Sequence, residues 1–325
     1  MLLPGYPSAI RTVLSRHEWV NELQTSSLAD ASIRDLGAIE GPVLIFGGPY
    51  SNLEATRALL AEADRLRIDT RNMICTGDAV AYGADPEATV AIMRRRGIAT
   101  VLGNVEEQLG AEAADCGCGF APGTTCERLS AAWYGYGAGR LDRDAKAWMA
   151  ALPRMIRFTL GGRRFAVVHG APSRINRFVF ASAADHDLAA EIALSGAEAV
   201  IGGHCGLPFT RSIGDKLWHN AGVIGMPAND GTPRTWFSTL ALEGARIRLT
   251  RRPLAYDHGR AAEKMREAGL PAEYSQALGS GLWDNDEILP PPERAAKGHP
   301  LAPLSTTWPS AMAPGPRAAA EASIA

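Results

Sequence analysis

Short apolar runs alternate with helical stretches from Val43 onward, and this alternation restricts the fold more than any other feature. VLIFGG (43–48), NMICTG (72–77) and ATVLGN (99–104) have the length and composition of buried strands. Between the first two, NLEATRALLAEADRL (52–66) carries leucines at helical spacing. Such alternation predicts an α/β domain with a largely parallel sheet.

The second half of the chain is richer in strand signals. RFTLGGRRFAVVHG (157–170) predicts two strands joined at a Gly-Gly turn, and AEAVIGGH (197–204) predicts another. Three further β segments follow in KLWHNAGVIGMP, TWFSTLAL and ARIRLTRRP. Because these strands come late in the chain, we expect a second sheet packed on the first.

The two ends differ from the predicted core. Residues 1–40 mix polar and apolar types and predict a lead-in of one or two short helices. Residues 253–290 predict a helical extension. Residues 291–325 are rich in Pro and Ala and predict a disordered tail.

Charge and composition exclude several classes of protein. The chain of 325 residues has a formal net charge of −2, so we expect no nucleic-acid partner. No apolar run is long enough to span a bilayer, and the N-terminus lacks the pattern of a signal peptide. Five cysteines, an odd number, favour a mostly reduced protein. We therefore expect a cytoplasmic protein without a membrane partner; the oligomeric state is left open.

Four of the predicted strands end in a glycine beside a polar residue. These polar residues are Asp78, Asn104, His169 and His204. In α/β sheets ligands bind at the carboxyl ends of strands, so the four side chains are expected to converge. Carboxylate, amide and imidazole donors suit one divalent ion such as Zn, Mn or Fe. The alternative is that they are hydrogen-bonded polar residues with a structural role only.

Five segments occur together in an order typical of one family. They are GGPYSNLEA (47–55), GDAVAYGADP (77–86), GNVEE (103–107), VVHGAP (167–172) and GHCGLPF (203–209). From about Val43 to Leu249 the chain resembles the calcineurin-like metallophosphoesterases, especially their small bacterial phosphodiesterases. The resemblance implies a four-layer α/β/β/α sandwich of two mixed β-sheets flanked by helices. It implies a phosphoesterase domain over 41–252, with a Cys-containing cap loop at about 108–150.

The resemblance also implies a site for two metals, of which this chain keeps one half. Asp78 matches the bridging aspartate, and Asn104, His169 and His204 match the other ligands of the second metal. The ligands that bind only the first metal, and the histidine that protonates the leaving group, are replaced. The replacements are Gly48, Tyr50, Gly206 and Val105.

This pattern predicts a site remodelled for one metal, with the same four residues as its catalytic residues. The function predicted is hydrolysis of a small phosphoester by a metal-dependent, phosphodiesterase-like enzyme. A non-catalytic metal- or ligand-binding protein of the same fold is the alternative. Tyr50 is expected to fill the place of the first metal. Glu106 and Glu107 could supply a carboxylate to the site, but a solvated helix start is the preferred interpretation.

A second metal or redox site is suggested by the cysteines. Cys116, Cys118 and Cys126 lie in a Gly-rich segment, and Cys205 lies within GHCG. Together they could bind Zn or an iron–sulfur cluster, which would make the chain a metal or redox protein. Free thiols or a disulfide are the alternatives. Cys75 belongs to a predicted buried strand.

Three residues are candidates for binding substrate. Asn52 follows the first motif and would either contact substrate or cap a helix. Arg174 follows VHGAP and would bind a phosphate, unless it lies on a solvated loop. His219 is expected at the edge of the cleft.

Overall fold

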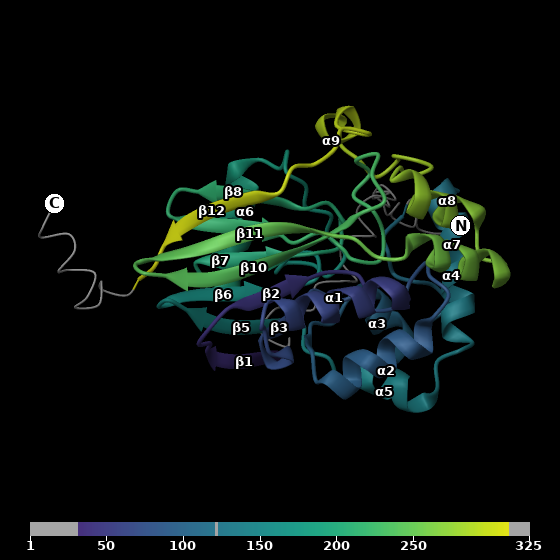
Figure 1. The fold of residues 1–325 in the computed structure, drawn as a ribbon, viewed down its shortest axis with the longest axis horizontal. Coiled ribbons are helices and arrows are strands. Elements are labelled where there is room, and N and C mark those ends of the chain that lie inside the picture. Colours follow the sequence, from purple (N-terminus) through teal and green to yellow (C-terminus); the bar gives the residue numbers. More distant parts are fainter. Residues whose placement is uncertain (1–31, 121–122, 312–325) are drawn as a thin grey trace, which may run out of the picture.

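The computed structural model describes residues 32–120 and 123–311, which contain two six-stranded mixed sheets facing each other (Figure 1). In spatial order the first sheet consists of β1 (Ile33–Ala38), β5 (Met155–Leu160), β6 (Arg163–Val167), β7 (Ala199–Gly202), β9 (Lys216–Asn220) and β8 (Phe209–Ile213). The second consists of β12 (Leu304–Pro309), β11 (Arg246–Leu254), β10 (Thr235–Glu243), β2 (Val43–Phe46), β3 (Met73–Cys75) and β4 (Ala99–Thr100). Strands β2, β3 and β4 run parallel, as do β6 and β7, so their carboxyl ends lie at common sheet edges.

Helices cover the outer faces of both sheets. The helices of the described residues are α1 (Leu53–Arg65), α2 (Pro86–Arg96), α3 (Asn104–Gly110), α4 (Thr125–Ala138), α5 (Arg143–Ala150), α6 (Asp185–Ser195), α7 (His258–Glu267), α8 (Ala272–Ser280) and α9 (Pro291–Ala295), with a 3₁₀ turn η1 at Thr70–Asn72; α4 and α8 lie beyond one end of the sheets (Figure 1). Side chains of α1 and α2 pack on the second sheet, and those of α6 pack on the first. The predicted four-layer α/β/β/α sandwich is confirmed. Within the described residues, no helix is long and apolar enough to cross a membrane.

The strand VLIF shows how the sequence produces these layers. Successive side chains of a strand point to opposite faces. Val43 and Ile45 enter the core between the two sheets, whereas Leu44 and Phe46 enter the core under the helices. All four are 0–1% exposed, as expected for a strand covered on both sides.

The predictions for the chain ends need correction. Residues 33–38, placed in a helical lead-in, form the edge strand β1, which gains its backbone hydrogen bonds from β5. The segment 291–325, predicted to be a disordered tail, contains α9 and also β12, which pairs with β11. Residues 1–31 and 312–325 lie outside the described residues.

Candidate metal centre

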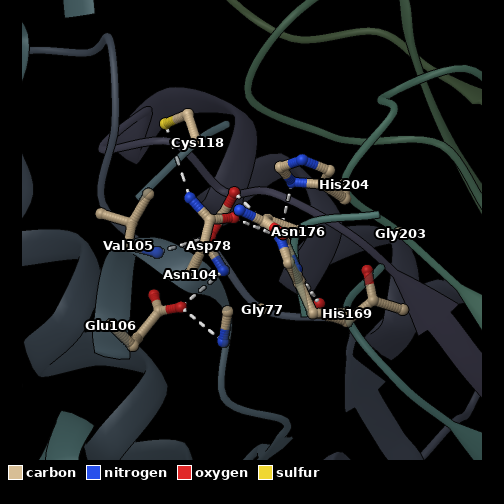
Figure 2. A network of polar contacts seen from close by, with 12 residues as sticks. Gly77, Asp78, Asn104, Val105, Glu106, Cys118, His169, Asn176, Gly203 and His204 are labelled. Atoms are coloured by element: carbon tan, nitrogen blue, oxygen red, sulfur yellow. Dashed lines mark hydrogen bonds and ion pairs between the residues drawn. The ribbon is translucent and has the colours of Figure 1, made fainter. Parts of the chain in front are cut away.

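Four polar side chains from four strand ends meet at one point, as Figure 2 shows. Asp78 and Asn104 follow β3 and β4 of one sheet, and His169 and His204 follow β6 and β7 of the other. The His169 Nε2 atom lies 2.9 Å from Asn104 Oδ1, 3.0 Å from His204 Nδ1 and 3.3 Å from Asp78 Oδ2. Ligand atoms of Asp78 and the two histidines all lie within 4.8 Å of one another. We call these four side chains the ligand cluster.

The hydrogen bond on the far side of His169 sets the orientation of its ring. Nδ1 lies 2.7 Å from the Thr76 carbonyl oxygen, which only accepts, so Nδ1 carries a proton. In the neutral ring the lone pair of Nε2 then faces the ligand cluster. A histidine that binds a metal is commonly oriented by such a bond to a carbonyl. Burial lowers the pKa of His169, but the Asp78 carboxylate, the hydrogen bond to the Thr76 carbonyl and the charge of Glu106 together raise the pKa overall.

Two members of the ligand cluster have strained backbones. Asp78 and His204 have φ angles of +59° and +58°, a region that non-glycine residues seldom occupy. The neighbouring backbone leaves no room for side chains either: a Cβ atom on Gly103 would lie 2.3 Å from Asp78 Oδ1. Such strain is typical of functional sites, where the surroundings hold the backbone in place.

Glu106 supports the loop that carries Asp78. Its buried carboxylate accepts hydrogen bonds from the backbone N–H groups of Asp78 (2.8 Å), Ala79 (2.6 Å) and Gly103 (3.0 Å). Burial and the Asp78 charge raise the pKa of Glu106 to about 7. The preference for a solvated helix start is therefore wrong for Glu106, although it fits the partly exposed Glu107.

The ligand cluster fits a borderline divalent ion. It offers two imidazole nitrogens, a carboxylate and an amide oxygen, a donor set suited to Zn, Mn or Fe. Burial and the neighbouring His169 lower the pKa of His204 to about 3, so its ring is neutral, the form that binds metals. The buried Nε2 atom of His204 has no hydrogen-bond partner among the described residues.

Tyr50 packs against Gly48, and the resemblance places ligands of a first metal at both positions. A Cβ atom added to Gly48 would lie 2.4–2.8 Å from ring atoms of Tyr50, so the phenol occupies the space that an aspartate there would use. Tyr50 is 5% exposed, and burial raises its pKa well above the usual value. Gly206 faces the ring of Trp283, whose nearest atom would be 3.6 Å from an added Cβ. Val105 lines the cavity beside the ligand cluster and has no proton to donate.

The three predicted substrate-binding residues have different environments. Asn52 caps α1: its Oδ1 accepts from the Ala55 amide, and its Nδ2 donates to the Gly225 carbonyl. Both halves of its side chain are therefore used within the protein. Arg174 lies exposed on the loop after His169, and within the described residues it has no ion-pair partner.

His219 does not lie at the cleft edge, so that prediction is wrong. It is 0% exposed and lies on the same face of β9 as Leu217, which packs between the two sheets. Its Nδ1 contacts Thr210 Oγ1 at 3.0 Å. Burial and the charge of Arg251 lower its pKa to about 3. The ring is a polar member of the core.

The predicted Zn or iron–sulfur site is not formed. Cys116 and Cys118 are joined by a disulfide, and the Cys126 thiol donates to Asn285 Oδ1 at 3.1 Å. Burial raises the pKa of Cys126 to about 11 and that of Cys205 to about 12, so both thiols are protonated near neutral pH. Within the described chain, the candidate metal-binding group comes from the ligand cluster alone.

Comparison with known proteins gives one family match and several similar structures. The model of the calcineurin-like phosphoesterase superfamily domain matches residues 48–243, which contain the whole ligand cluster. An uncharacterized protein of Methanocaldococcus jannaschii is 23% identical over 258 residues, covering 74% of this chain and 98% of that protein.

Two solved structures show the same fold. A metallophosphoesterase from Sphaerobacter thermophilus is 21% identical, with a TM-score of 0.58 over 75% of this chain and 100% of that chain. A hypothetical protein from Pyrococcus horikoshii is 15% identical, with a TM-score of 0.63 over 74% of this chain and 99% of that chain. With the family match over residues 48–243, the chain belongs to the calcineurin-like phosphoesterase superfamily.

Proposed function

We propose that this protein is a metal-dependent hydrolase of a small phosphoester that works with one divalent ion. The observation that carries the proposal is the asymmetry of the site. Three donor atoms surround the Nε2 atom of His169, which is the fourth, while Tyr50 packs against Gly48 where a ligand of the first metal would stand. A decayed site would lose ligands of both metals, whereas here one complete set remains.

Asp78, Asn104, His169 and His204 would hold the ion. When bound, a divalent ion polarises a phosphoryl oxygen and lowers the pKa of a water molecule. The chain's own residues supply the rest. Glu106 holds the loop of Asp78 through three backbone amides, and the Thr76 carbonyl orients His169. Arg174 is exposed and its charge acts on His204, so it is the proposed contact for a phosphate oxygen.

Val105 limits the expected rate. General-acid assistance contributes about 10²–10⁴-fold to typical enzymes, and a valine cannot supply it. Val105 in place of the family's histidine is also the observation that favours the alternative, a metal-binding protein of the same fold without hydrolytic activity. A cytoplasmic location remains part of the proposal.

Metal analysis combined with one substitution tests the proposal. We expect about one ion per chain in protein purified without chelator, and hydrolysis of bis(p-nitrophenyl) phosphate that stops on chelation and returns with Mn²⁺. His204→Ala should lose the ion and the activity together, whereas His186→Ala, on an exposed side chain, should keep both. Two tightly bound ions, or none after loading, would contradict the one-metal site. One ion without hydrolysis would favour the non-catalytic alternative.

A further inference from the structure

A cavity beside the ligand cluster is lined mainly by aromatic and apolar side chains. Asp78 and His204 form part of its wall, so the cavity and the ligand cluster are continuous. Tyr82 lies at the centre of an aromatic group in this wall. Its ring centroid is 5.1 Å from that of Trp133 and 4.6 Å from that of Tyr274. A ligand held at the metal would therefore place its remaining atoms against these rings.

One side of this cavity comes from the C-terminal extension. Glu273 and Tyr274 belong to α8, and the loop after α8 adds Trp283 and Asp284. The family model ends at residue 243, so these residues lie outside the shared domain. This side of the cavity is therefore built by residues beyond the matched domain.

The charge of the cavity wall is negative. Among the described residues, its lining includes the carboxylates of Asp78, Glu273 and Asp284 but no lysine or arginine. Within the described residues, neither Glu273 nor Asp284 forms an ion pair, although the charges of both act on Tyr274. A cavity with unpaired carboxylates and aromatic walls attracts cations.

We propose that this cavity binds an alkylammonium group, and that the substrate is a small zwitterionic phosphoester. The phosphoester half rests on the proposed function, since the phosphate would be held at the ligand cluster and Arg174. The ammonium half rests on the cavity alone. Aromatic faces attract quaternary ammonium groups, and the two unpaired carboxylates add attraction over a longer range.

A pair of isosteric probes tests the ammonium half without any hydrolysis. Choline carries a trimethylammonium group, and 3,3-dimethylbutan-1-ol has the same shape without the charge. Titration calorimetry on the full-length protein should show choline binding about tenfold more tightly than the alcohol, the size of one cation–π contact in a desolvated site. Added salt should weaken choline binding more than alcohol binding.

Variants locate the binding. Glu273→Gln and Tyr274→Leu should each weaken choline binding several-fold, about the size of one charge or ring contact. Glu267→Gln removes the same charge from the exposed face of α7 and should leave binding unchanged. No choline binding, equal binding of the alcohol, or unchanged affinity in both cavity variants would overturn the proposal. Choline binding without phosphoester hydrolysis would overturn the proposed hydrolase but leave the ammonium site standing.

Discussion

Single residues of the ligand cluster hold conformations that an isolated peptide would avoid. The left-handed backbones of Asp78 and His204 cost roughly 1–3 kcal/mol each. Part of that cost is offset by Glu106, whose carboxylate accepts hydrogen bonds from the backbone N–H groups of Asp78 and Ala79. The shape of the site therefore depends on a residue that contacts no predicted ligand atom.

The buried His219 makes stability depend on pH. Its pKa is about 3 in the folded protein and about 6.5 in an unfolded chain. Above pH 6.5 the ring is neutral in both states, so pH has no effect through this residue. Below pH 6.5 the unfolded chain binds a proton that the folded protein does not. The free energy of unfolding then falls by up to ~1.4 kcal/mol per pH unit as the pH approaches 3.

Urea denaturation between pH 7 and pH 4 measures this effect. His219→Gln should show a shallower fall in the free energy of unfolding than the wild type. His186→Gln should follow the wild-type slope, because the His186 side chain is 85% exposed. Parallel slopes for the wild type and His219→Gln would contradict the assignment of His219 to the core.

The sequence was enough to select the residues of the ligand cluster, but not to predict which other polar residues are buried. Glycine beside a polar residue at four strand ends was enough to select the four members of the ligand cluster. The burial of His219 was not predictable, because the alternation that places it between the sheets becomes clear only once Leu217 is known to face inward. Glu106 did leave a signal: it is the third residue of a helix whose N-cap is Gly103, the position from which a glutamate reaches back to the cap.

At the scale of elements, a short loop controls one member of the ligand cluster. The Asn104 Nδ2 atom donates to the Cys116 carbonyl at 2.8 Å and contacts Cys118 Sγ at 3.5 Å, as part of the network in Figure 2. These contacts fix the amide so that its Oδ1 faces His169. The disulfide between Cys116 and Cys118 closes this loop. Two of the cysteines that suggested an additional metal site, Cys116 and Cys118, thus contact Asn104 of the ligand cluster.

Opening the disulfide should weaken metal binding. A Cys116→Ser/Cys118→Ser variant loses the covalent link that constrains the loop, so Asn104 would be held less firmly. We expect the affinity for Mn²⁺ to fall about tenfold, a typical effect of losing a partner that orients a ligand. Calorimetry with and without a phosphine reductant measures it. Cys126→Ser, which removes a thiol bonded to Asn285 instead, is the matched control. Equal Mn²⁺ affinity in oxidised and reduced wild type would show that the disulfide does not influence Asn104.

At the scale of the whole molecule, the central strands could be predicted and the edge strands could not. Central strands such as β2 are buried on both faces and therefore form continuous apolar runs. The edge strand β1 is mostly exposed and lacks that pattern, so its pairing with β5 decides its structure. In β12, a stretch of six residues was hidden by the Pro- and Ala-rich composition around it. Its proline at residue 309 ends the strand, a position that edge strands tolerate.

Strand β12 contributes to the core between the two sheets through the side chain of Trp308. Trp308 is 7% exposed, packs edge-to-face on Phe165 at 5.7 Å and donates to the Asp215 carbonyl at 3.1 Å. It joins the core between the two sheets although it comes from the last strand of the sheet, β12.

Trp308→Ala should therefore lower the free energy of unfolding by about 3–5 kcal/mol, the usual cost of removing a buried aromatic side chain. Leu304→Ala, on the same strand but 36% exposed, should cost less than about 1 kcal/mol. Urea denaturation measures both variants, and Mn²⁺ affinity measured in native buffer should stay unchanged because Trp308 touches no member of the ligand cluster. A Trp308→Ala protein that unfolds at the wild-type urea concentration would mean that β12 adds little to the core. A variant with normal stability but weakened Mn²⁺ binding would instead mean that the strand acts on the metal centre.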